Sequence, residues 1–93
     1  MWAITRYHGP LEEEVGPVVK DEQQNIDAEK IRNCDIPIVM FRLLDGDREV
    51  YASGITQDLD KYGDVPFEPL DEWGADYGCV SLQYIKNGQW VEL

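Results

Sequence analysis

Short runs of alternating hydrophobic and polar residues, rich in β-branched and aromatic side chains, recur along the chain. This pattern is typical of strands that have one buried face. The runs predict five strands, at residues 2–7, 36–44, 47–52, 80–86 and 89–93. Turn residues separate most of these runs, so neighbouring strands are expected to pair antiparallel.

Two of the gaps between the runs are dipeptides that favour tight hairpins, Asp-Gly at 45–46 and Asn-Gly at 87–88. A two-residue turn at 45–46 would place Arg42 opposite Glu49. Opposite charges in that position stabilise an antiparallel pair by about 0.2–1 kcal/mol. The second turn would join the last two strands in the same way.

Residues 22–32 have helical features at both ends and a thin apolar stripe between them. Asp21 and Gln24 form a capping-box pattern, in which each side chain binds the other residue's backbone N–H. Lys30 and Arg32 lie where the negative end of a helix dipole favours cations. The segment therefore predicts one short helix. Its apolar stripe consists of Ile26, Ala28, Ile31 and Cys34.

These elements combine into a single α+β domain that covers residues 1–93. The expected antiparallel sheet has about five strands, from two hairpins plus the N-terminal strand, with the one short helix beside it. Gly9-Pro10 ends the first strand, and residues 11–20 predict a loop with an extended second half. Residues 57–79 predict a long, ordered, acidic loop.

The acidic loop has neither a helical nor a strand period. It contains one cation, Lys61, and seven carboxylates. The carboxylates are Asp58, Asp60, Asp64, Glu68, Asp71, Glu72 and Asp76. Aromatic residues such as Tyr62 and Trp73 argue against disorder, because disordered segments are poor in them. We therefore expect apolar side chains to pin the loop to the core while its carboxylates face water.

The whole chain is acidic, with 19 acidic and 8 basic residues and a formal net charge of −11. Such a charge repels nucleic acids and anionic membranes and speeds association with basic proteins. Eight cations are also few for a groove that follows a phosphate backbone, so direct nucleic-acid binding is not expected. There is no secretory signal and no apolar run of about 18 residues, which predicts a cytoplasmic protein that spans no membrane.

The residue types that most often carry catalysis or bind metals are few and scattered. His8 is the single histidine, and no Ser or Cys near it in sequence forms a nucleophile pair, so we expect an ordinary histidine at the rim of the sheet. Cys34 and Cys79 lie far apart without a Cys-x-x-Cys motif. They predict reduced, buried thiols, with a bridge between them left open, and no zinc site. The sequence therefore predicts no enzyme and no cofactor.

One part of the acidic loop begins like a calcium-binding loop. Asp58, Asp60 and Gly63 occupy the first, third and sixth positions of the EF-hand pattern. The fifth position is Tyr62 rather than Asp or Asn, and no Glu stands at the twelfth. A non-standard calcium site made by Asp58, Asp60 and Asp64 is therefore an alternative, while the main expectation is no metal site.

Residues 67–79 read Phe-Glu-Pro-Leu-Asp-x-x-Gly-x-x-x-x-Gly-Cys and precede the Asn-Gly hairpin. In this the chain resembles small acidic bacterial proteins that have no assigned function, over residues 38–93. The resemblance implies a stand-alone bacterial or mobile-element domain and transfers no catalytic residue. By size and charge only, the chain is also similar to inhibitors made by phages and plasmids, such as anti-CRISPR, anti-restriction and immunity proteins.

Charge and resemblance together predict a non-catalytic acidic inhibitor or adaptor. It would bind a basic, nucleic-acid-handling protein and occupy the surface meant for DNA or RNA. The residues expected to bind this partner are Asp58, Asp60, Asp64, Glu68, Asp71, Glu72 and Asp76, with Tyr62 and Trp73 as aromatic anchors. The alternatives are a small calcium-binding domain and an acidic housekeeping domain without an inhibitory role.

Overall fold

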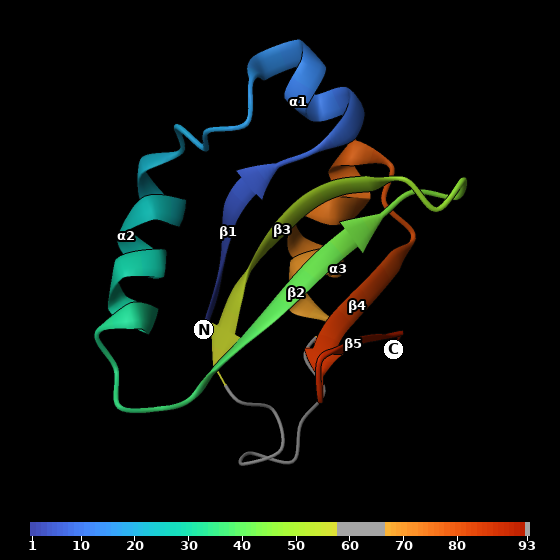
Figure 1. The fold of residues 1–93 in the computed structure, drawn as a ribbon. Helices are drawn as coiled ribbons and strands as arrows, with labels where there is room; N and C mark the ends of the chain where they lie inside the picture. The colour runs from blue at the N-terminus through green and yellow to red at the C-terminus, as the bar shows by residue number, and fades with distance from the viewer. Residues whose placement is uncertain (58–66, 93) are drawn as a thin grey trace.

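The computed structural model describes residues 1–57 and 67–92. Its strands are β1 (Trp2–Tyr7), β2 (Ile38–Leu44), β3 (Val50–Gln57), β4 (Ser81–Lys86) and β5 (Gln89–Glu92). Its helices are α1 (Gly9–Val15), α2 (Glu22–Arg32), α3 (Glu68–Glu72) and the 3-10 helix η1 (Gly74–Tyr77). The strands form one antiparallel sheet in the order β1-β3-β2-β4-β5 (Figure 1). The predicted α+β class, the five-stranded antiparallel sheet and the Asn-Gly hairpin are confirmed.

The two faces of this sheet differ in what covers them. Alternate residues of the central strands, such as Phe41, Leu43 and Leu82, belong to the main hydrophobic core on one face. α3 and η1 lie on that face, with Leu70 and Trp73 packed against the core (Figure 1). On the other face α2 covers β1 and β3 through a smaller cluster of Ala3, Ala28, Ile31 and Ile55. No described helix covers the rest of this second face, over β2, β4 and β5, and we call it the open face.

α2 begins and ends as the sequence predicts, but its first turn differs. Asp21 is the N-cap, and its Oδ1 accepts hydrogen bonds from the N–H groups of Gln23 at 2.9 Å and Gln24 at 3.2 Å. The Gln24 side chain does not complete the capping box. Its Oε1 instead accepts a hydrogen bond from the Ile4 N–H of β1 at 2.7 Å. Because β1 is an edge strand, this contact blocks the edge and also fixes α2 to the sheet.

The prediction of a single helix is wrong. Pro10 lies in the first turn of α1, where its missing N–H costs nothing, so Gly9-Pro10 starts a helix after it ends a strand. The extended second half of the 11–20 segment is present, with Val18 bridged to Arg6. The predicted apolar stripe of α2 is confirmed for two of its four residues. Ala28 and Ile31 are buried, whereas Ile26 and Cys34 are exposed.

The structure describes Gln57 and residues 67–79 of the predicted acidic loop, and there the prediction is wrong. Gln57 is the last residue of β3, and residues 68–77 form α3 and η1, two short helical segments joined at Trp73. Pro69 lies in the first turn of α3, as Pro10 does in α1. Neither segment reaches two turns of α-helix, so neither leaves a helical period that a sequence pattern can show.

The turn between β2 and β3 is longer than the two residues predicted. The Oδ1 atom of Asp45 accepts hydrogen bonds from the N–H groups of Asp47 and Glu49, both at 2.9 Å. The wider turn shifts the register of the hairpin, so that Arg42 lies opposite Ser53. The predicted pair of Arg42 with Glu49 is therefore wrong.

Candidate functional site

Four of the predicted partner-binding carboxylates lie on α3 and η1, and all four are exposed. They are Glu68, Asp71, Glu72 and Asp76. No Lys or Arg occurs between residues 67 and 79, so the segment has four negative side chains and no positive one. We call these four residues the α3–η1 acidic face.

Aromatic and small residues hold the acidic face against the sheet. The Trp73 ring stacks on those of Tyr7 and Tyr77, with centroid distances of 6.2 and 4.3 Å. Gly74 lies so close to the core that a Cβ there would be 3.1 Å from Cys79 Cβ and 3.3 Å from Leu43 Cδ1. Trp73, a predicted anchor for the partner, is therefore half-buried and helps to fix the backbone that presents the carboxylates.

The remaining predicted partner residues, Asp58, Asp60, Tyr62 and Asp64, lie outside the described residues, and so does the alternative calcium site. In the part of the chain that the structure describes, no group of three or more His, Cys, Asp or Glu side chains could hold a metal ion. No helix within residues 1–57 and 67–92 is long and apolar enough to cross a membrane.

The two cysteines are free, and only one of them is buried as predicted. Cys79 belongs to the main core, where burial raises the pKa of its thiol to about 11. Cys34 is exposed after the end of α2, and its Sγ lies 3.8 Å from Gln57 Nε2. The two thiols therefore have different environments.

A row of polar side chains crosses the second face of the sheet, from β1 and β3 over the open face to β5. The pairings place Arg6 opposite Ser53, Ser53 opposite Arg42, Arg42 opposite Gln83, and Gln83 opposite Glu92. Opposite residues of an antiparallel pair have Cβ atoms about 5 Å apart, so Ser53 lies between two arginines. Each residue of the row comes from a different strand. The sequence does not reveal the row, because it depends on the register of four separate pairings.

His8, at the start of α1, joins this row through Ser53. Its Nε2 lies 2.8 Å from Ser53 Oγ, although 45 residues separate the two in sequence. Burial, and then the charge of Arg6, lower the pKa of His8, while Glu12 opposes this shift. A serine hydroxyl that is hydrogen-bonded to a histidine resembles two of the three members of a catalytic triad. Among the described residues, however, no carboxylate binds the other ring nitrogen and orients the ring.

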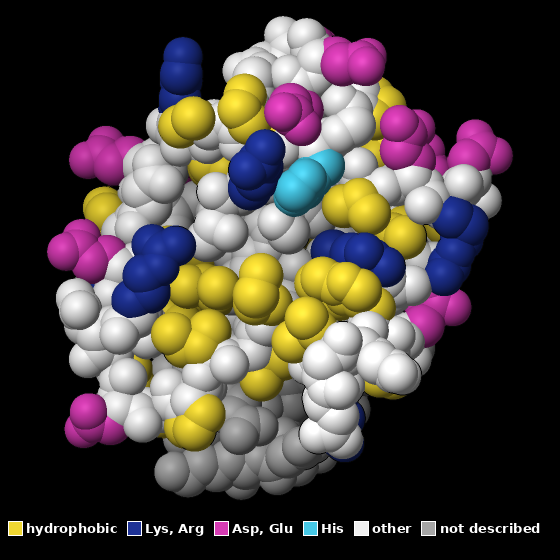
Figure 2. Space-filling model, viewed as in Figure 1, with side chains coloured by type: hydrophobic (Ala, Val, Ile, Leu, Met, Phe, Trp, Pro, Cys, Tyr) yellow, Lys and Arg dark blue, Asp and Glu magenta, His cyan; other side chains and the backbone are white. Residues whose placement is uncertain are grey.

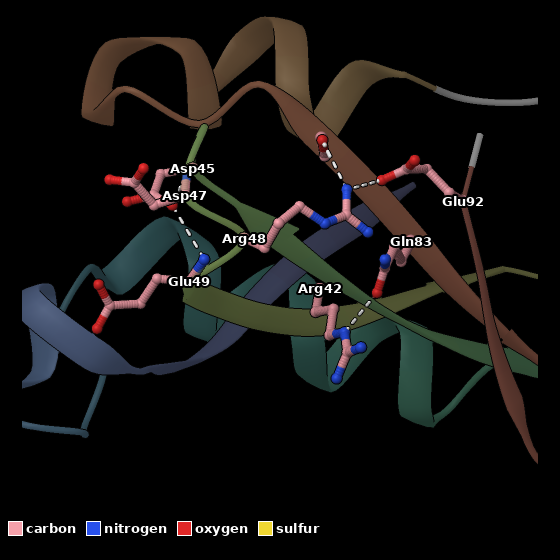
Figure 3. Close-up of polar contacts among 8 residues, drawn as sticks. Arg42, Asp45, Asp47, Arg48, Glu49, Gln83 and Glu92 are labelled. Atoms are coloured by element: carbon pink, nitrogen blue, oxygen red, sulfur yellow. Dashed lines mark hydrogen bonds and ion pairs between the residues drawn. The ribbon is translucent and has the colours of Figure 1, made fainter.

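Arg42 is held in one orientation by two neighbours. Its Nε donates a hydrogen bond to Oε1 of the buried Gln83 at 2.7 Å (Figure 3). Its guanidinium carbon lies 4.3 Å from the centre of the Trp90 ring. Among the residues that the structure describes, no carboxylate pairs with Arg42, whereas Arg48 pairs with Glu92. Arg42 also lines an open hollow of about 250 Å³. The other residues that line this open-face hollow are His8, Met40, Val50, Ser53 and Trp90.

No protein-family model, curated protein or solved structure matches the chain. The resemblance to small acidic bacterial proteins therefore stays a prediction. Two surfaces on opposite faces of the sheet are candidate sites, the α3–η1 acidic face and the open-face hollow.

Proposed function

We propose that the protein is a non-catalytic acidic inhibitor or adaptor that binds a basic, nucleic-acid-handling protein through the α3–η1 acidic face. The observation that carries this proposal is the exposure of all four carboxylates on a backbone that Trp73 and Gly74 hold against the core. A surface that is already ordered loses little conformational freedom on binding.

The charges of this face suit a partner that normally binds phosphates. Carboxylates several ångströms apart can take the positions of backbone phosphates in a cationic groove, and charge complementarity of this kind sets specificity and association rate. The net charge of −11 adds a long-range attraction to the same partner. Binding is therefore expected to weaken steeply as salt rises, because salt screens exposed charges.

The test is competition with DNA. A fluorescent oligonucleotide is bound to a candidate basic DNA-binding protein, and its anisotropy reports whether this chain displaces it at low and at high salt. The key variant reverses three acids of the acidic face: Asp71→Lys, Glu72→Lys and Asp76→Lys. The matched control reverses three exposed acids of α1 and α2: Glu13→Lys, Glu14→Lys and Glu29→Lys.

Both variants change the formal net charge from −11 to −5, because each of the three reversals adds two charges. We expect only the variant in the acidic face to lose the ability to displace DNA. Equal losses in the two variants would show that net charge alone matters. Unchanged displacement by the first variant would refute binding through α3 and η1.

A further inference from the structure

The open face has a surface unlike the rest of this acidic chain. Figure 2 shows hydrophobic side chains gathered over the middle of this face, with the histidine and several Lys or Arg side chains beside them and Asp and Glu towards the periphery. Ile38 and Met40 of β2 are 43% and 48% exposed, although β2 is the central strand of the sheet. Exposed apolar surface with a polar border is typical of interaction sites.

Within this surface, Arg42 is arranged to bind a carboxylate. Gln83 accepts a hydrogen bond from its Nε, and the two terminal nitrogens are directed away from Gln83 (Figure 3). Trp90 lies against the face of the guanidinium. A planar guanidinium can bind a carboxylate through two parallel hydrogen bonds. Since Gln83 and Trp90 already hold the side chain, little further freedom is lost when a ligand binds.

Among the described residues, no carboxylate forms an ion pair with Arg42. Arg6 lies two strands away in the polar row, and its ion pair with Glu12 is long, at 3.9 Å, between side chains that are 58% and 38% exposed. An exposed pair of this kind contributes little. Burial and Arg6 lower the pKa of His8 from the ordinary 6.5, which favours the neutral form of this neighbour. The hollow is therefore a place where this chain attracts an acid rather than repels it.

We propose that the open-face hollow is a docking site for a short acidic and apolar peptide segment of a partner protein. A carboxylate of the segment binds the terminal nitrogens of Arg42 beside Ser53, and an adjacent aliphatic or aromatic side chain covers Met40 and Val50. A phosphate group or a nucleic acid would leave these apolar residues uncovered, and the net charge of −11 would repel a polyanion.

This site lies on the opposite face of the sheet from the α3–η1 acidic face, so it does not depend on the proposed function. Ser53 and Arg42 alternate along their strands with Ala52 and Leu43, which face the core beneath α3 and η1. One chain can therefore hold a basic partner on one face and an acidic segment on the other.

The test is an NMR titration of the full-length ¹⁵N-labelled chain with capped peptides at millimolar concentration. The central residues of the peptides are Leu-Asp-Leu, Leu-Asn-Leu, Gly-Asp-Gly and Leu-Lys-Leu. We expect the Leu-Asp-Leu peptide to shift the Ser53 amide, the Arg42 Nε–H and the Trp90 indole signals. The other three peptides should bind at least about tenfold more weakly, because each lacks the charge or the apolar contact.

Three results of this titration would overturn the proposal. The first is equal binding of the Asp and Asn peptides. The second is an equal response to acetate or inorganic phosphate, which would mean a simple anion site. The third is a shift of the same signals with protein concentration alone, which would mean that a second copy of the chain covers the hollow.

Variants of the chain distinguish the effect of the Arg42 guanidinium on peptide binding from the effect of net charge. Arg42→Gln should weaken binding of the Leu-Asp-Leu peptide about tenfold, as expected for the loss of a charge-assisted hydrogen-bond pair. Lys30→Gln removes the same charge from the exposed side of α2 and should leave binding unchanged. Met40→Glu, at a half-exposed position, places a carboxylate of the chain itself beside Arg42 and should block the peptide in a folded protein. Wild-type affinity in both Arg42→Gln and Met40→Glu would exclude this site.

Discussion

Gly54 of β3 lies directly against the β1 backbone and the Phe41 ring, and its replacement by alanine is a sharp test of the fold. Gly54 lies opposite Ile4 of β1 and Phe41 of β2. A Cβ at this position would be 2.0 Å from the carbonyl oxygen of Ala3 and 2.7 Å from Cζ of Phe41. Cβ atoms essentially never approach another heavy atom within 3.0 Å, so Gly54→Ala requires the β1 backbone to move by about 1 Å.

The surroundings of Gly54 cannot yield easily. Edge-to-face contacts with Trp2 and Tyr84, at centroid distances of 6.4 and 6.2 Å, hold the Phe41 ring. Overpacking of a core usually costs about 1–3 kcal/mol, and here the obstacle is backbone as well as a ring. We expect Gly54→Ala to lower the free energy of unfolding by about 3 kcal/mol. With an m-value of about 1.5 kcal/mol/M, the urea midpoint would fall by about 2 M.

Gly46→Ala is the matched control, because no atom lies within 4 Å of its Cβ position and its φ is not in the left-handed region. The same substitution there should move the urea midpoint by less than about 0.3 M, since exposed substitutions usually change stability by less than about 0.5 kcal/mol. Tryptophan fluorescence and circular dichroism follow the two transitions. If both variants unfold at the same urea concentration, β1 and Phe41 do not approach Gly54 as described.

Three further predictions concern the N-cap of α2, the two thiols and His8. Asp21→Ala should lower the free energy of unfolding by about 1 kcal/mol, and Asp21→Ser should restore most of it, because serine also caps helices; equal urea midpoints for the two would contradict the cap. A chromogenic disulfide reagent should titrate the Cys34 thiol in the native protein and the Cys79 thiol only in denaturant. Rapid reaction of both native thiols would contradict the burial of Cys79. The pKa of His8 is lower in the folded protein than in the unfolded chain, where it is 6.5. As pH falls, the unfolded chain therefore takes up the proton at a higher pH than the folded protein does. The free energy of unfolding should decrease as the pH falls below 6.5. His8→Gln should lose this dependence in urea melts at a series of pH values, and an unchanged slope would refute it.

Many elements could be predicted because their signals act over a few residues. Asp21 starts α2 through hydrogen bonds to the N–H groups two and three positions later, so the cap is encoded in adjacent residues. The Asn87-Gly88 turn depends only on the left-handed backbone of these two residues, with φ of 53° and 79°. The alternating pattern likewise places β1 at the residues predicted.

The same local rules fail where a side chain has a competing partner. The sequence alone assigns Gln24 to its own helix cap, but in the fold the Ile4 N–H of β1 provides an alternative donor. The Asp45 carboxylate binds two N–H groups across the turn and widens a hairpin whose dipeptide signal favours two residues. Pro10 and Pro69 begin short helices that lack the length to show a period.

By itself, then, the sequence determined the class of the fold, four of the five strands, the main helix, the net charge and the acidity of residues 67–79. The remaining strand, predicted at 47–52, is β3 at Val50–Gln57, because the turn before it is wider than predicted. Only the tertiary structure decided which residues meet. Arg6, Ser53 and Arg42 form a row because the registers of β1 with β3 and of β3 with β2 align them, including an irregularity in each pairing. A shift of one residue would turn these side chains to the other face, since successive side chains of a strand alternate. Contacts between strands fix that alignment, and no short stretch of the chain contains the information.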